Sequence, residues 1–264
     1  MALNSFIRDF GWADASKSTR DTIQANIVST FQAGCFFGAL LTFPIAEKIG
    51  RRKTVMIAGV VFLLGGTLMT AAQGNLNLIY VGRAIAGLGI GASSLTVPVY
   101  IAEVAPPSIR GRLVGIFEIA SQGGGMLGFW INYATDRTIN VNNKAQWIIP
   151  LALQLFPGVM LVIGMIWCPE SPRWLARGDN FDAAETILTT LRGLPSSDPY
   201  IQREMGEIRA QVEERSTNHL SKYAQFKKLF QKGTRNRMGI GLALMFLQSF
   251  TGVSKDNPTS NCKH

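Results

Sequence analysis

The chain has 264 residues, of which 47% are hydrophobic and only 16% are charged, and its formal net charge is +9. A soluble domain carries roughly 25% charged residues, so this composition argues against an ordinary soluble protein. The basic residues lie between apolar runs, a pattern typical of loops at an anionic membrane face and not of a nucleic-acid-binding stripe. The three cysteines and two histidines are scattered, and they predict neither a disulfide framework nor a metal site.

Six apolar segments approach the length that a membrane-spanning helix needs, about 20 residues. Each is rich in small and aliphatic residues, which suits close packing between helices in a membrane. We therefore predict an all-α integral membrane protein. The predicted spans are residues 26–46, 54–72, 76–101, 113–134, 146–168 and 238–253.

The loops between these spans alternate in lysine and arginine content. Loops 47–53, 103–112 and 169–237 are basic, whereas residues 73–75 carry no basic residue and residues 135–145 carry few for their length. The positive-inside rule places the basic loops in the cytoplasm and predicts a multi-pass topology.

The long third basic loop carries helix signals of its own. Asp179 or Asn180 can cap a helix over residues 181–192, which Gly193 would end. Pro199 then opens a second helix with an apolar stripe and an opposite charged face; the stripe is Ile201, Met205, Ile208 and Val212, and the charged face is Arg203, Glu204, Glu207, Arg209, Glu213 and Glu214. Residues 222–232 suit a helix at the membrane surface, and a solvated linker is the alternative.

Three motifs follow one another in the basic loops. They are EKIGRRK at 47–53, PVYIAEVAPPSIRGR at 98–112 and PESPRWL at 169–175. Together, in this order and spacing, they resemble the sugar porter family of the major facilitator superfamily. Residues 124–133 and 146–150 make the chain most similar to fungal monosaccharide and quinate permeases within that family.

The resemblance implies transport of a monosaccharide or a related polyhydroxy compound (a hexose or quinate) by alternating access. It also implies proton symport in the plasma membrane, with no cofactor and no enzymatic activity. A non-transporting sugar sensor and an inactive truncated product are the alternatives. No catalytic set of side chains is visible in the sequence.

Aligned to the family, residues 26–46 correspond to its second helix, and the resemblance ends after residue 253. We therefore expect a major facilitator fragment, family helices 2 to 7, truncated at both ends. The expected parts are an exterior loop remnant (1–25), a first half lacking its first helix (26–168), a cytoplasmic helical linker (169–237), the start of the second half (238–253) and a tail unlike the family (254–264).

The motif residues at the cytoplasmic helix ends are candidates for a latch between conformational states. In transporters of this type, charged pairs there are thought to hold the outward-open state, and arginine suits such pairs because it can bind a carboxylate in a bidentate manner. The alternative is that they only anchor helix ends at the membrane surface. The candidates are Gly50, Arg51, Arg52, Glu103, Arg110, Gly111, Glu170 and Arg173.

Arg83 lies inside the third predicted span, where a charge is costly and points to a function. In proton-coupled sugar porters the matching arginine pairs with an aspartate of the first helix, which implies a role in proton coupling; the alternative is an arginine that reaches toward the membrane surface. The resemblance also implies substrate contacts from Gln122 and Gln248, with Gln32 as a further candidate. Each of the three could instead only join helices.

Overall fold

The structure is a computed structural model that describes residues 4–12, 16–140, 143–217, 236, 239–241, 243 and 247. The elements in chain order are α1 (Asn4–Asp9), α2 (Lys17–Ile49), α3 (Arg51–Thr70), α4 (Leu76–Val104), α5 (Arg110–Thr138), α6 (Ala145–Leu153), α7 (Leu155–Trp167), α8 (Pro172–Arg177), α9 (Phe181–Arg192) and α10 (Pro199–Thr217). The chain divides into residues 1–209 and 210–264. In the second unit, the structure describes only the end of α10 and a few helical residues.

Four helices are long and apolar enough to cross a membrane: α2, α3, α4 and the segment Ala145–Trp167, which contains α6 and α7. These contain or largely overlap four of the six predicted spans. The fourth predicted span forms α5, whose polar stretch around Glu118 and Gln122 lowers its hydropathy, so its passage through the membrane stays a prediction. The sixth predicted span and the predicted surface helix at 222–232 lie largely or wholly outside the described residues.

Local sequence signals explain where α2 begins and where the segment Ala145–Trp167 is interrupted. The helix α2 begins at Lys17, earlier than the predicted residue 26, because the Ser16 hydroxyl accepts a hydrogen bond from the Thr19 amide at 3.2 Å. The segment predicted as one span at 146–168 is interrupted at Gln154. Pro157 lacks the N–H that would bond to the carbonyl of Leu153, which favours a break there.

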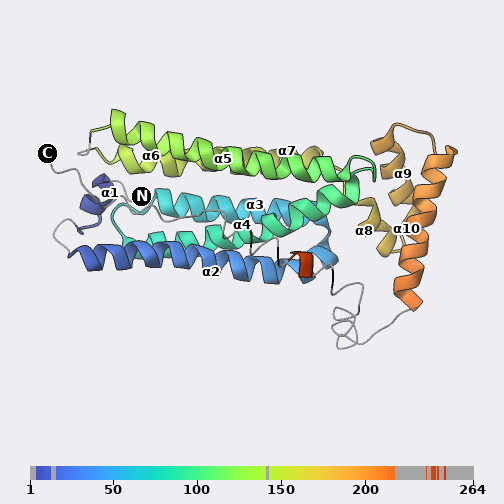
Figure 1. The fold of residues 1–264 in the computed structure, drawn as a ribbon, viewed down its shortest axis with the longest axis horizontal. Helices are drawn as coiled ribbons and strands as arrows, with labels where there is room; N and C mark the ends of the chain where they lie inside the picture. Colours follow the sequence, from blue (N-terminus) through green and yellow to red (C-terminus); the bar gives the residue numbers. More distant parts are fainter. Residues whose placement is uncertain are drawn as a thin grey trace. The chain divides into compact units, whose positions relative to one another are not determined.

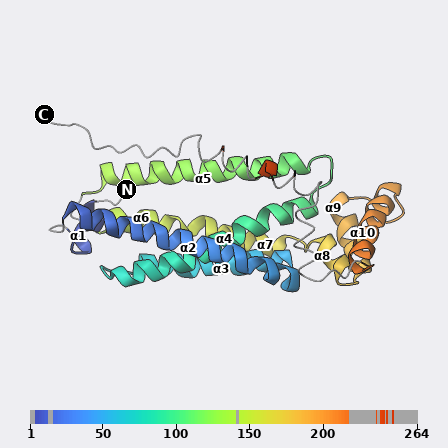
Figure 2. The same cartoon turned by 60° about the horizontal axis from the view of Figure 1, so that its bottom comes forward.

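The helix α4 packs along both α2 and α3, and the close approach depends on glycine (Figures 1 and 2). A Cβ added at Gly87 or Gly91 of α4 would collide with backbone atoms of α2. A Cβ at Gly65 of α3 would likewise collide with the backbone of α4 at Ala86. Small residues therefore let three backbones approach one another, as in other membrane helix bundles.

Large apolar side chains cover much of the helical surface. They are exposed on α2 and along α5, including Phe36, Phe37, Leu40, Leu41, Ile116, Ile119, Met126, Leu127, Phe129 and Trp130. Exposed apolar area of this extent suits contact with lipid or with another apolar surface. With the four long apolar helices, it makes the chain a multi-pass membrane protein.

Two ends of the bundle carry different side chains. The basic end comprises the α2–α3 turn at Gly50, the α4–α5 turn and the segment 168–171 that follows α7. The far end comprises α1, the α3–α4 turn and the start of α6. Its core contains four aromatic or large apolar residues from the α1–α2 link, α3 and α6, namely Phe10, Trp12, Met69 and Trp147.

Candidate functional site

The turn between α2 and α3 is built around Gly50 and Glu170. Gly50 has a φ of 104°, and a Cβ there would lie 2.5 Å from Glu170 Oε2, so the position favours glycine. Glu170 Oε1 accepts hydrogen bonds from the backbone amides of Arg51 at 2.9 Å and of Arg52 at 3.0 Å. These amides begin α3 and have no partner within the helix, and the helix dipole favours a carboxylate at this end. Glu170 therefore caps α3 from a position 119 residues away along the chain.

Arg51 forms a buried ion pair with Glu103 at the end of α4. Its Nε lies 3.0 Å from Glu103 Oε2, and the two side chains are only 6% and 10% exposed. Its Nη1 donates to the carbonyl of Ala46 at 3.0 Å. The Ser171 hydroxyl donates to the same Glu103 oxygen at 2.6 Å. One carboxylate therefore joins α4 to α3 and to the segment before α8.

Further hydrogen bonds tie the end of α7 and the start of α8 to the same cluster. The Arg52 Nε donates to the Met165 carbonyl at 2.9 Å, and its Nη2 donates to the Ile166 carbonyl, so Arg52 satisfies two of the last four carbonyls of α7. The Tyr100 hydroxyl donates to the Pro169 carbonyl at 2.6 Å. The Trp174 indole donates to the Glu47 carbonyl at 2.8 Å. We call Gly50, Arg51, Arg52, Glu103, Glu170 and Ser171, with these contacts, the basic-end network.

Within the described residues, no side-chain hydrogen bond or ion pair joins the remaining latch candidates to this network. Among the residues that the structure describes, Arg110 and Arg173 form no ion pair, and the buried Nε of Arg110 has no hydrogen-bond partner. A Cβ added at Gly111 would meet nothing within 4 Å. The structure thus brings together five of the eight predicted latch residues and leaves three outside the cluster.

Two of the helices predicted in the long loop, at 181–192 and from Pro199 onward, are confirmed, with one correction. Asn180 caps α9 by accepting from the Ala183 amide at 3.3 Å, and Gly193 ends it in the left-handed conformation. The helix α10 begins at Pro199 as predicted, and its stripe residues Ile201, Met205 and Ile208 are buried.

The assignment of Glu204 to the charged face opposite the apolar stripe was wrong. Glu204 accepts a bidentate pair of hydrogen bonds from Arg192 at 2.8 and 3.1 Å, and the two side chains are 11% and 7% exposed. Arg192 also donates to the Val104 carbonyl at 3.0 Å, at the end of α4. Glu204 lies three residues after Ile201 and four before Ile208, so the helical period places it at the edge of the apolar stripe, where contact with α9 buries it. No local sequence signal identifies Arg192 as its partner.

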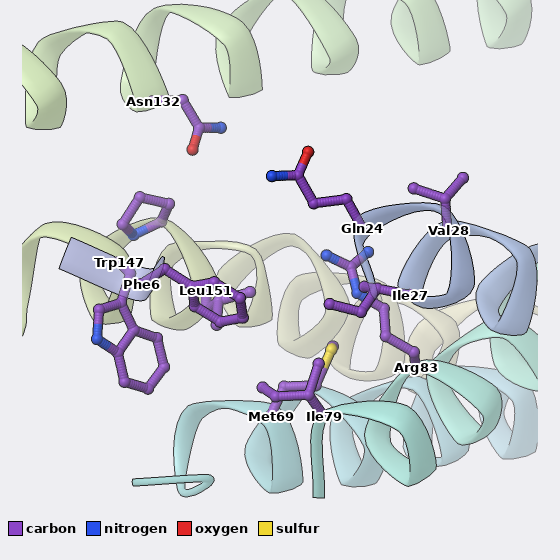
Figure 3. Close-up of a pocket in the computed structure, with 11 residues that line it drawn as sticks. Phe6, Gln24, Ile27, Val28, Met69, Ile79, Arg83, Asn132, Trp147 and Leu151 are labelled. Atoms are coloured by element: carbon purple, nitrogen blue, oxygen red, sulfur yellow. The ribbon is translucent and has the colours of Figure 1, made fainter. Parts of the chain in front are cut away.

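A cavity of about 210 Å³ lies at the far end of the bundle (Figure 3). Its polar lining comes from three helices, namely Gln24 of α2, Arg83 of α4 and Asn132 of α5. The rest is apolar and consists of Phe6, Ile27, Val28, Met69, Ile79, Trp147, Pro150 and Leu151. Sequence reasoning singled out only Arg83 among these residues, because the others belong to helices that pair only in the folded bundle.

Arg83 is half-buried at this cavity. Its guanidinium carbon lies 5.7 Å from the centroid of the Phe31 ring, a distance typical of a cation–π contact. Its Nε is buried and has no hydrogen-bond partner within the described part of the chain.

The predicted substrate residues are not gathered in that cavity. Gln122 is exposed on α5 and donates to Glu118 Oε1 at 3.1 Å, one turn away. Gln32 is exposed on α2. Gln248 lies outside the described residues. Within those residues there is also no group of three histidine, cysteine, aspartate or glutamate side chains that could hold a metal ion.

Comparison with known proteins assigns the family. The model of the family described as "Sugar (and other) transporter" matches residues 1–255. A probable quinate permease of Aspergillus fumigatus is 44% identical over 97% of this chain and 48% of its own length. A quinate permease of Neurospora terricola is 40% identical over the same shares. The chain thus spans about half the length of the curated relatives it matches.

Solved structures agree with this assignment. The proton:xylose symporter XylE bound to 6-bromo-6-deoxy-D-glucose superposes with a TM-score of 0.73 at 26% identity, over 81% of this chain and 48% of that chain. The inward-open xylose transporter XylE from E. coli gives a TM-score of 0.68 at 27% identity, over 79% and 50%. The predicted all-α major facilitator fold is thereby confirmed over this part of the transporter. The chain belongs to the sugar (and other) transporter family of the major facilitator superfamily, a family of membrane transporters and not of enzymes.

Proposed function

We propose that this chain forms part of a plasma-membrane symporter that moves a monosaccharide or a related polyhydroxy compound, such as quinate, together with a proton. Relatives named quinate permeases and a proton:xylose symporter support this substrate class and this coupling. Residues 26–168 would then belong to the first transporter half, 169–237 to a cytoplasmic linker, and 238–253 to the first helix of the second half. Residues 1–25 would form part of an exterior loop, and 254–264 a tail outside the transporter core.

The observation that carries the proposal is the buried Arg51–Glu103 ion pair within the basic-end network. Alternating access needs contacts that are present in one conformation and absent in the other. A pair whose oxygen and nitrogen lie 3.0 Å apart, with both side chains nearly excluded from water, meets that need, because its rupture has a definite free-energy cost. We infer that this network is the cytoplasmic latch, and Arg110, Gly111 and Arg173 stay latch candidates outside it.

Substrate contacts and proton coupling are assigned on the same basis. Gln122, Gln32 and Gln248 would donate and accept hydrogen bonds with substrate hydroxyl groups, which need partners once water is excluded. Arg83 would take part in proton coupling. Its half-buried charge at the cavity supports this role, because a charged side chain in the membrane interior is costly and usually marks a functional site.

Uptake of radiolabelled quinate and D-glucose into transporter-deficient yeast tests the proposal. Two proteins are compared: the chain itself, and a chimera in which it replaces the matching half of the Aspergillus fumigatus permease. We expect the chimera to accumulate at least one of the two compounds, and the external medium to become more alkaline as it does. Loss of both signals in a chimera that reaches the cell surface would contradict the proposal, and uptake without alkalinisation would contradict symport.

The latch is tested with Glu103→Gln in the same chimera, with Glu207→Gln as the matched control. Glu207 belongs to an exposed pair with Arg203, and such pairs contribute little. We expect uptake to fall several-fold for Glu103→Gln and to be unchanged for Glu207→Gln. Equal uptake by both variants would show that the buried pair only anchors helix ends.

A further inference from the structure

The last of the four long apolar segments, which contains α6 and α7, has a weak point in its far half. Pro157 has no N–H for the Leu153 carbonyl, so one backbone hydrogen bond of a regular helix is missing there. Pro150 inside α6 likewise has none for the Gln146 carbonyl. Kinks in helices arise at prolines and where the hydrogen-bond ladder is interrupted. The helix α6 can therefore swing relative to α7 about Gln154, where the two meet.

The side-chain amides near the two ends of α6 are not fully paired. Gln146 is completely buried, and its Nε2 donates to Asp136 Oδ1 at 3.2 Å. Its Oε1 is buried and has no hydrogen-bond partner among the described residues. The same holds for Nε2 of Gln154 at the junction with α7. Unpaired buried polar atoms are costly, so they favour a second position of α6 in which both amides are paired.

The short helix α1 holds α6 in its described position. The two lie side by side at the far end (Figures 1 and 2). The rings of Phe6 in α1 and of Phe10 just after it lie 5.8 and 5.6 Å from the ring of Trp147, both near edge-to-face. The Trp147 indole N–H donates to Asp9 Oδ2 at 3.0 Å, and the Asp9 side chain is only 9% exposed. A hydrogen bond to a carboxylate is stronger than one between neutral groups.

The same helix also contacts the turn between α3 and α4. A Cβ added at Gly74 in that turn would lie 3.0 Å from the Asp9 carbonyl oxygen. Met69 at the end of α3 and Ile79 at the start of α4 belong to the same buried cluster as Trp147. With only six residues, α1 is too short to be a stable helix by itself. Its helical form therefore depends on these contacts, which tie α6 to the α3–α4 turn.

We propose that α6 is a hinged gate at the far end, and that α1 is the strap that holds this gate shut. While the Asp9–Trp147 hydrogen bond is made, α6 stays fixed to the α3–α4 turn. Once it breaks, α6 swings about Gln154 and α1 leaves its seat. Such a movement opens the bundle on the side opposite the basic-end network, as alternating access requires. The gating role rests on the proposed transport function, whereas the hinge and the strap do not.

The strap is tested by cysteine labelling of the full chain in lipid nanodiscs. Cys35, Cys168 and Cys262 are replaced by alanine, and one thiol is then introduced. Ser5→Cys reports on the strap, because Ser5 lies in α1 and is completely buried. Thr42→Cys, buried on α2, is the matched control for loosening of the whole bundle. The labelling rate with a water-soluble maleimide measures how often each thiol becomes exposed.

Removal of the Asp9–Trp147 bond should release the strap. We expect Asp9→Ala to raise the labelling rate at Ser5→Cys about tenfold or more and to leave that at Thr42→Cys unchanged. Trp147→Phe keeps an aromatic ring but loses the indole N–H, and should act in the same direction. Asp9→Asn keeps an acceptor for the indole and should label at nearly the parent rate. Equal rates in the parent and in Asp9→Ala, or equal acceleration at both thiols, would overturn the strap.

The hinge is tested with Pro157→Ala in the same background. Pro157 is exposed and lies in α7, away from the aromatic cluster. Alanine supplies the missing N–H for the Leu153 carbonyl and stiffens the span. We expect labelling at Ser5→Cys to slow about threefold or more, because α6 then swings less often. A cluster that only packs locally predicts no effect from so remote a change, so an unchanged rate would overturn the hinge.

The gating role is tested by uptake in the Aspergillus fumigatus chimera. Pro157→Ala should lower uptake of quinate or D-glucose several-fold at an equal amount of protein at the cell surface. Unchanged uptake together with slower labelling would overturn the gating role. A parent chimera that transports neither compound would refute the transport proposal, while the labelling rates would still decide the strap and the hinge.

Discussion

Replacement of Gly50 by alanine tests the architecture of the basic-end network most directly. The backbone at Gly50 has a φ of 104°, which costs a residue with a side chain about 1–3 kcal/mol. The new Cβ would lie 2.5 Å from Glu170 Oε2 and 3.0 Å from its Cδ, so the carboxylate must move off the start of α3. Loss of a hydrogen bond to a charged group costs about 1.5–3 kcal/mol. The expected destabilisation is therefore about 2.5–6 kcal/mol.

Gly111→Ala is the matched control, because it makes the same chemical change in the neighbouring motif, where the new Cβ meets nothing within 4 Å. Alanine also favours a helix over glycine by about 1 kcal/mol. The assay is the apparent melting temperature of the detergent-purified chain. We expect Gly50→Ala to melt about 10 °C lower and Gly111→Ala to melt at or slightly above the parent temperature. Similar melting of the two variants would refute the role assigned to the glycine and to Glu170.

Three further predictions concern contacts elsewhere in the bundle. Gly91→Val should prevent α4 from packing on α2, so size-exclusion chromatography should show an aggregated or strongly destabilised chain. Gly128→Val, with open space around it, should elute like the parent. Identical elution of the two variants would contradict the close packing at Gly91. Arg192→Gln breaks the buried ion pair with Glu204, and the loss of such a pair costs about 3–5 kcal/mol. Amide hydrogen exchange in α9 should therefore accelerate at least about tenfold, and unchanged exchange would contradict a stabilising role of the pair. Trp174→Phe keeps an aromatic ring but loses the indole N–H and its hydrogen bond to the Glu47 carbonyl, about 0.5–1.5 kcal/mol, and should lower the melting temperature by only a few degrees. A fall as large as that of Gly50→Ala would contradict this expectation.

The elements of the long loop could be read from the sequence because their signals are local. An asparagine before an apolar-periodic run, a glycine after it and a proline at the next helix start mark these elements, and the structure has the predicted bounds of α9 and the predicted start of α10. The apolar spans are equally local, since length and hydropathy are properties of one segment. The helix α1 carries no comparable signal in so short a run, and the sequence suggested only a loop there.

The motifs marked the residues of the basic-end network, but the tertiary structure decided how they pair. From charge alone, Glu170 could form an ion pair with any nearby arginine. In the structure it instead accepts hydrogen bonds from backbone amides at the start of α3, and Glu103 forms the ion pair with Arg51. Ser171 enters the network without any charge to suggest it.

The same division holds at the far end. The sequence by itself determined that Arg83 is an unusual charge in an apolar span, whereas only the folded bundle placed Gln24, Asn132 and Phe6 around one cavity with it. The physical reason is the distance along the chain over which each interaction acts. Caps, turns and hydropathy act within a few residues, while ion pairs, aromatic contacts and cavities depend on the approach of helices that are far apart in the chain.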